Sequence, residues 1–149
     1  MADLAPAIGD VIEGPALAIT RETIREFAEA SLDYNPLHLD DAYMEGSFGK
    51  TQFGGIIMHG MTNFGLITRM LTDWALASGA VHRRLETRWL NPVRPGDTIR
   101  PRATVARVVT THRSRWITFS VEVKNQRGET VATGEALAEI GAPAIAPAS

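Results

Sequence analysis

An aspartate and a histidine flank a turn in residues 31–40, which read SLDYNPLHLD. Asp33 and His38 stand on either side of Asn35-Pro36, a dipeptide typical of turns, so their side chains can converge on one point. A carboxylate beside an imidazole can hold one water and move its protons in both directions, which is general acid–base catalysis at neutral pH. The same spacing also fits an aspartate that caps a turn next to a surface histidine.

A second stretch, residues 53–61 (FGGIIMHGM), leads into a long apolar segment. The backbone N–H groups near Gly60 have no partner at a helix start and lie at the positive end of the helix dipole. Such groups can stabilise a carbonyl oxygen that becomes negative during a reaction, as in an oxyanion hole. An ordinary helix start with glycines for close packing fits equally well. We expect His59 to bond backbone groups rather than to catalyse.

Two helices are predicted to position these residues. Thr20 is a typical N-cap, and apolar residues at helical spacing predict an amphipathic helix over 21–31. Residues 33–57 have no sustained period and should be mostly loop, with a helical turn near 42–45. Residues 60–77 are apolar nearly all round, which is typical of a buried helix.

The remainder of the chain, from residue 83, is typical of strands. Residues 98–105 and 115–123 alternate between apolar and polar side chains, and the phase breaks at 106–109, which suggests a bulge. Residues 130–140 place small groups on one face. Turn signals stand at 91–97 and 125–128, and the Ala- and Pro-rich end predicts a flexible tail at 141–149. One buried helix against one bent antiparallel sheet gives an α+β domain.

Composition excludes several classes of protein. The 149 residues contain 15 Lys and Arg against 17 Asp and Glu, so the net charge of −2 argues against a general nucleic-acid binder. The absence of cysteine excludes disulfides and thiolate sites. No apolar run is long enough to span a membrane and no signal peptide is evident, so we expect a cytoplasmic protein that does not bind membranes. Residues 83–115 carry nine arginines, which fits either wet strand faces or a site for a small anion.

The two chemical stretches together resemble one family. The pattern Asp-x-Asn-Pro-x-His-x-Asp over residues 33–40, followed by Ile-x-His-Gly-Met over 57–61, resembles the signature of the MaoC-like (R)-specific enoyl-CoA hydratases. The turn at 91–97 fits that family, and the resemblance extends over residues 8–140. It implies a hot-dog domain over 1–140, in which a curved sheet wraps a central helix, assembled as a homodimer or a dimer of dimers. It also implies reversible addition of water to trans-2-enoyl-CoA.

The resemblance assigns roles to several candidate residues. Asp33 and His38 would activate the water, and the N–H of Gly60 would polarise the thioester carbonyl. No metal and no bound cofactor are implied, because coenzyme A, or an acyl carrier protein, belongs to the substrate. The resemblance also gives Asn35 as a brace of the loop and Thr68 as a supporting hydroxyl, a position where a threonine inside a helix can equally bond its own backbone. Beyond the resemblance, the loop residues Tyr43, Phe48 and Phe53 fit either the wall of an acyl pocket or a satellite of the core. In the arginine-rich segment, the candidates for contact with the CoA anion are Arg84, Arg88 and Arg94.

One departure and three alternatives remain. Family members often carry glycine before the catalytic aspartate, whereas this chain has Leu32, which is expected to narrow the pocket or change the loop angle. A hot-dog thioesterase would instead place its acid on the central helix, where this chain has only Asp73. A non-catalytic subunit would tend to lose the Asp/His pair. A metal site of Asp33, His38, Asp40 and His59 has suitable residue types but no standard ligand spacing.

Overall fold

A computed structural model describes residues 6–46 and 53–141 of the chain. The elements follow one another as β1 (Val11–Glu13), β2 (Leu17–Ala18), α1 (Arg21–Ser31), α2 (Pro36–Leu39), α3 (Asp41–Glu45), α5 (Gly60–Ser78), β3 (Ala80–Trp89), β4 (Thr98–Thr110), β5 (Ser114–Asn125) and β6 (Thr130–Gly141). The predicted α+β class is confirmed. No helix among these residues is long and apolar enough to cross a membrane.

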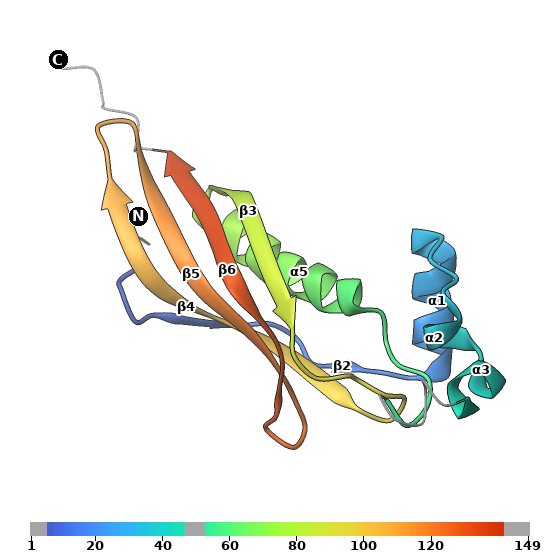
Figure 1. Cartoon of the computed structure of the whole chain (residues 1–149). Helices are drawn as coiled ribbons and strands as arrows, with labels where there is room; N and C mark the ends of the chain where they lie inside the picture. Colours follow the sequence, from blue (N-terminus) through green and yellow to red (C-terminus); the bar gives the residue numbers. More distant parts are fainter. Residues whose placement is uncertain (1–5, 47–52, 142–149) are drawn as a thin grey trace, which may run out of the picture.

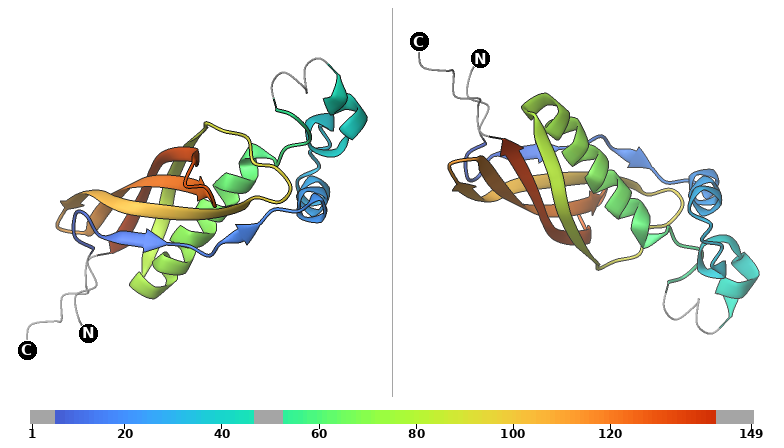
Figure 2. Two further views of the ribbon diagram at one scale, coloured as in Figure 1. Left: turned by 90° about the horizontal axis from the view of Figure 1, so that it is seen from below. Right: turned by 90° about the horizontal axis from the view of Figure 1, so that it is seen from above.

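The sheet is antiparallel and curves around α5 (Figures 1 and 2). Its strand order is β1-β4-β5-β6-β3, and the short β2 also pairs with β4. The register of β4 against β5 shifts between Val105 and Arg107, inside the segment where the sequence predicts a bulge. Gly134 of β6 lies so close to β3 that a Cβ atom there would collide with the carbonyl oxygen of Glu86. Glycine at this position therefore permits the close approach of the two strands.

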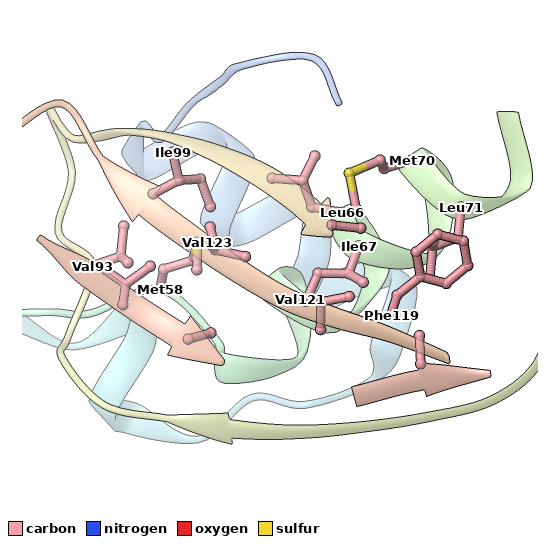
Figure 3. Close-up of a cluster of buried hydrophobic side chains, with 14 of the residues drawn as sticks. Met58, Leu66, Ile67, Met70, Leu71, Val93, Ile99, Phe119, Val121 and Val123 are labelled. Atoms are coloured by element: carbon pink, nitrogen blue, oxygen red, sulfur yellow. The ribbon is translucent and has the colours of Figure 1, made fainter. Parts of the chain in front are cut away.

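The core lies between α5 and the concave face of the sheet (Figure 3). The edge of the Trp74 ring meets the Phe119 ring, with centroids 5.1 Å apart. Small residues on β6, as predicted for 130–140, leave room for the helix. The core includes Leu66, Ile67, Met70 and Leu71 of α5, Ile117, Phe119, Val121 and Val123 of β5, and Ala132, Ala136 and Ala138 of β6.

The sheet of one chain covers only one side of α5, so the helix is less buried than its composition predicts. Met61 and Leu76 point outward, and Leu76 is 79% exposed. The neighbouring edge strand β3 adds the exposed Trp89 to this apolar surface. A single sheet can contact only one side of a helix, which explains the difference.

Helix α1 matches the predicted bounds and the predicted cap. The Thr20 hydroxyl accepts a hydrogen bond from the Thr23 N–H at 3.1 Å, and the Thr23 hydroxyl accepts one from the Thr20 N–H at 2.9 Å. These reciprocal bonds form a capping box. The helix ends at Leu32, whose φ of 60° and ψ of 23° are left-handed. Only Leu32 among the described non-glycine residues has a positive φ.

Leu32→Gly is expected to stabilise the fold by about 1 kcal/mol, because a left-handed conformation is costly for a residue with a Cβ atom and free for glycine. The side chain is 75% exposed, so its removal sacrifices little buried apolar surface. The melting temperature should rise by about 2–4 °C in a calorimetric scan. Leu32→Ala, which keeps a Cβ atom, should give no comparable rise, and equal melting temperatures for all three proteins would contradict this account.

Residues 36–39 form the short helix α2 where the sequence predicts loop. Proline disfavours helical geometry in the residue before it but suits the first position of a helix, because it lacks the N–H that would be unpaired there. The Asn35 side chain caps this helix by accepting a hydrogen bond from the Leu37 N–H at 3.1 Å. The predicted turn at 42–45 is confirmed as α3, which is capped by Asp40.

The strand predictions need two adjustments at their ends. Strand β3 begins at Ala80, three residues before the predicted start, because Gly79 in a left-handed conformation ends α5 and turns the chain at once. Strand β6 continues to Gly141. Residues 142–149 of the predicted tail lie outside the described residues.

Candidate active site

Asp33 lies in the short loop between α1 and α2. Its Oδ1 accepts a hydrogen bond from the Asn35 N–H at 3.2 Å, which fixes the turn that carries the carboxylate. Asp33 is exposed and borders a pocket. Asn35 in turn caps α2 with its side chain.

His38 on α2 is buried and held in one tautomer. Its Nδ1 lies 2.7 Å from the carbonyl oxygen of Ile57. A carbonyl only accepts, so Nδ1 carries the proton and Nε2 is left as a hydrogen-bond acceptor. Burial lowers the pKa of His38 below its ordinary value of 6.5, although the Ile57 carbonyl and Asp33 partly offset this effect. His38 is therefore a neutral imidazole at pH 7, with an unprotonated nitrogen to offer.

His59 connects the loop of Asp33 to the start of α5. The ring is 1% exposed, and its Nε2–H donates to the carbonyl oxygen of Asp33 at 2.9 Å. It stacks on His38 with ring centroids 3.8 Å apart and meets Phe27 at 4.8 Å. These contacts agree with the expectation that His59 bonds the backbone.

Asp33, His38 and His59 each place one potential ligand atom within 4.8 Å of the others. The metal site considered from the sequence also needs Asp40, but Asp40 is outside this group and caps α3 instead. His38 Nδ1 and His59 Nε2 both bond main-chain carbonyls. The cluster is thus arranged as two imidazoles, each oriented by a main-chain carbonyl, beside a carboxylate.

Helix α5 begins at Gly60 without a side-chain cap, because the ring of the N-cap residue His59 turns toward Asp33. In the part of the chain that the structure describes, the Gly60 N–H has no backbone partner. A Cβ atom on Gly60 would lie 2.5 Å from Cδ2 of Trp89. From the sequence, the absence of a side chain at Gly60 is expected to leave room for a ligand. The structure shows that it also leaves room for the Trp89 ring.

These groups border one pocket of about 350 Å³. It joins the loop of Asp33, the start of α5 and the segment that follows β3. Its wall is fixed to the start of α5 by a hydrogen bond from the Met58 N–H to the Val93 carbonyl at 2.8 Å. The lining residues are Asp33, Leu37, His38, Phe53, Ile57, Met58, His59, Gly60, Met61, Asn63, Trp89, Leu90, Asn91, Pro92 and Val93.

The segment after β3 is held by Asp97. Its Oδ2 accepts from the Arg94 N–H at 2.9 Å, and its Oδ1 accepts from Arg127 Nη1 at 2.9 Å and from Gln126 Nε2 at 2.8 Å. The turn at 91–97 is therefore tied to the hairpin that joins β5 and β6. This network positions the pocket wall formed by residues 89–93.

Phe53 is the residue predicted near the acyl group that lines this pocket. Tyr43 on α3 is outside the pocket, and Phe48 lies outside the described residues. Thr68 is two turns along α5 from Gly60, outside the pocket, and its hydroxyl has no hydrogen-bond partner among the described residues. Leu32 is also absent from the lining, so the expected narrowing by its side chain is not seen in this chain.

The arginines predicted near an anion do not gather at the pocket. Arg84 pairs with Glu86 on its own strand and with Glu135 on the neighbouring strand β6. Arg88 directly precedes Trp89 on β3, and because side chains alternate along a strand it projects from the opposite face of the sheet. Arg94 borders a separate cavity of about 480 Å³ and donates its Nε–H to the Phe53 carbonyl at 2.8 Å.

Sequence reasoning missed Asn63, Trp89 and Asn91 as pocket residues. Asn63 carries a usable signal: it stands three residues before Leu66 and four before Ile67, on the stripe of α5 that enters the core. A polar residue on that stripe is a departure from the pattern. Trp89 and Asn91 carry no comparable signal, because they reach the pocket only through the pairing of β3 with β6.

Comparison with known proteins identifies the family of the chain. The (R)-specific enoyl-CoA hydratase of Rhodospirillum rubrum is 31% identical over 132 residues, which are 85% of this chain and 86% of that protein. The 3-hydroxybutyryl-CoA dehydratase of Methylorubrum extorquens is 30% identical over 122 residues, 82% of this chain and 73% of that protein. The solved structure of the MaoC-like dehydratase from Rhodospirillum rubrum is 27% identical with a TM-score of 0.79, covering 94% of this chain and 96% of that one. The family model of the MaoC like domain matches residues 3–127, and the chain belongs to this family of hot-dog proteins.

Proposed function

We propose that the protein catalyses the reversible hydration of trans-2-enoyl-CoA to (R)-3-hydroxyacyl-CoA. The observation that carries the proposal is the meeting of three groups in one pocket: the Asp33 carboxylate, the acceptor nitrogen of His38 and the unpaired N–H of Gly60. Relatives at about 30% identity are named as hydratases and dehydratases of this kind, which supports the same class of reaction here.

In this mechanism, Asp33 and His38 hold one water between them. His38 Nε2 accepts a proton from the water while the oxygen forms a bond to the β-carbon of the thioester. The electron pair of the double bond moves toward the thioester oxygen, and the Gly60 N–H at the helix start stabilises the resulting enolate. The α-carbon then takes a proton from the protonated His38. The sum is addition of H and OH, and the reverse sequence dehydrates the hydroxyacyl thioester.

The alternatives have less support from the geometry. A thioesterase would need an acid on the central helix, but Asp73 of α5 lies outside the pocket and faces Arg69 at 3.9 Å. A non-catalytic subunit would not need the tautomer of His38 to be fixed by Ile57. Neither alternative therefore accounts for a carboxylate and an oriented imidazole that border the same pocket.

We also propose that two copies of the chain associate through β3 and the outer side of α5. Strand β3 ends the described sheet, and exposed apolar side chains border it. They are Met61, Leu76, Trp89 and Leu90. Such a patch is typical of a protein interface. Light scattering coupled to size-exclusion chromatography should give twice the mass of the chain or a higher even multiple; the mass of one chain would contradict the proposal.

The direct test of the proposed reaction uses crotonyl-CoA and a longer trans-2-enoyl-CoA. We expect the ultraviolet absorbance of the conjugated thioester to fall when the protein is added, and chiral analysis should identify the (R)-3-hydroxyacyl product. A thiol assay on a saturated acyl-CoA serves as the control and should remain silent. Release of free CoA without hydration would favour the thioesterase instead.

The pH dependence should report the pKa of His38. Because His38 must be unprotonated to accept the proton of water, kcat/KM is expected to stay level at high pH and to fall about tenfold per pH unit on the acid side. Burial lowers this pKa, so the fall should begin below 6.5, the ordinary value for histidine. A profile of crotonyl-CoA hydration between about pH 4.5 and 9 tests this. A midpoint above the ordinary value would contradict the assignment of His38 as the base.

A further inference from the structure

Asn63 places an unsatisfied amide in the wall of the pocket. The side chain is 2% exposed, and its Oδ1 atom has no hydrogen-bond partner among the described residues. It borders the pocket together with Asp33, His38 and Gly60. Buried polar groups in proteins are normally paired, so an unpaired one beside a pocket indicates a ligand or a bound water as its partner.

Asn63 is a polar residue on the side of α5 that otherwise carries apolar core residues. Leu66 and Ile67, one turn later on the same side of the helix, belong to the hydrophobic core. An apolar side chain would therefore continue the stripe and avoid burying an unpaired group. Several other lining residues of the pocket, among them Leu37, Met58 and Val93, are apolar, so packing against them would not call for a carboxamide.

The reaction proposed above points to the part of the substrate that would meet Asn63. Gly60 would bind the thioester oxygen, and Asn63 lies three residues farther along the helix, a rise of about 4.5 Å. This is about the distance from the thioester carbon to the carbon just beyond the double bond, C4. A carboxamide both donates and accepts hydrogen bonds, and a hydroxyl group does the same.

We propose that Asn63 selects enoyl thioesters that carry a hydroxyl group on C4 over those with a plain alkyl chain. This inference rests on the proposed hydratase function and names its substrate class. Asn63 would bind the substituent and take no part in the proton transfers. Its contribution should therefore appear as a difference between two substrates and not as a general loss of rate.

The test compares two substrates of nearly equal size, 4-hydroxybut-2-enoyl-CoA and pent-2-enoyl-CoA, which differ by a hydroxyl in place of a methyl group. We expect the wild type to favour the hydroxylated substrate in kcat/KM. In Asn63→Leu, which has a similar volume, the ratio of the two kcat/KM values should fall about tenfold, the effect of losing one neutral hydrogen bond. Asn63→Ala on the same pair gives the same reading if the leucine variant does not fold.

Thr62→Val is the matched control. The Thr62 hydroxyl is also buried without a partner among the described residues, but Thr62 does not line the pocket, so the ratio should stay at the wild-type value. An unchanged ratio in Asn63→Leu, or an equal loss on both substrates, would overturn the inference. So would a wild type that hydrates pent-2-enoyl-CoA but rejects the hydroxylated substrate. A wild type that hydrates neither would instead overturn the proposed function.

Discussion

Asp33→Asn is expected to lower kcat for crotonyl-CoA hydration by about a thousandfold, within the range that general acid–base catalysis supplies. The amide keeps the size of the carboxylate, and its oxygen can still accept the hydrogen bond from the Asn35 N–H. The main chain of Asp33, which receives the bond from His59, is unchanged. The loss of activity should therefore come from the missing negative charge of the carboxylate beside the water, and not from a displaced loop. The decrease in kcat is measured by following the ultraviolet absorbance of crotonyl-CoA at saturating substrate concentration.

The control for this substitution is Asp73→Asn, which removes a carboxylate from the exposed side of α5. Its hydratase activity should equal that of the wild type. The melting temperature of Asp33→Asn should also match the wild type, because the side chain is exposed and its turn is kept. Retention of more than a tenth of the activity by Asp33→Asn would remove this carboxylate from the mechanism.

Gly60→Ala should lower kcat by about a hundredfold or more, the effect of losing one donor from an oxyanion hole. The added Cβ atom would lie 2.5 Å from Cδ2 and 2.7 Å from Cε2 of Trp89, so either the ring or the first turn of α5 must move. Movement of the first turn carries the N–H away from the thioester oxygen. Steady-state kinetics on crotonyl-CoA should show the loss in kcat, with a smaller change in KM.

A second substitution separates the steric cause from the electrostatic one. Trp89→Leu removes the ring that the new methyl group would strike. In the double variant Gly60→Ala/Trp89→Leu, a return of kcat to the level of Trp89→Leu alone would show that displacement of the N–H caused the loss. Full activity in Gly60→Ala by itself would mean that this N–H does not bind the thioester oxygen.

The sequence contains enough local information to predict the elements that support the site. The Thr20 cap and the spacing of Ile24 and Ala28 predict α1, and strict alternation predicts β5, because both signals depend on near neighbours. Helix α2 was missed because the effect of proline depends on its position: inside a helix it interrupts the helix, whereas at the first position it suits a helix start, as Pro36 does in α2. Local rules give no means of choosing between these outcomes.

The pair of Asp33 and His38 could be proposed from spacing and family resemblance, but its orientation could not. The tautomer of His38 depends on Ile57, which lies 19 residues away, and the link from His59 to Asp33 spans 26 residues. Trp89 meets Gly60 only because the sheet brings β3 beside the start of α5. Contacts of this range depend on the assembled fold, so residue spacing cannot reveal them.

The groups that orient the site are held by main-chain atoms. His38 bonds the carbonyl of Ile57, His59 bonds the carbonyl of Asp33, and Arg94 bonds the carbonyl of Phe53. Every residue type offers such a carbonyl, so the side chains of Ile57 and Phe53 are free to vary without loss of these bonds. Both of these side chains line the pocket. During evolution, the lineage can therefore alter the shape of this pocket while the orientation of His38 is inherited unchanged.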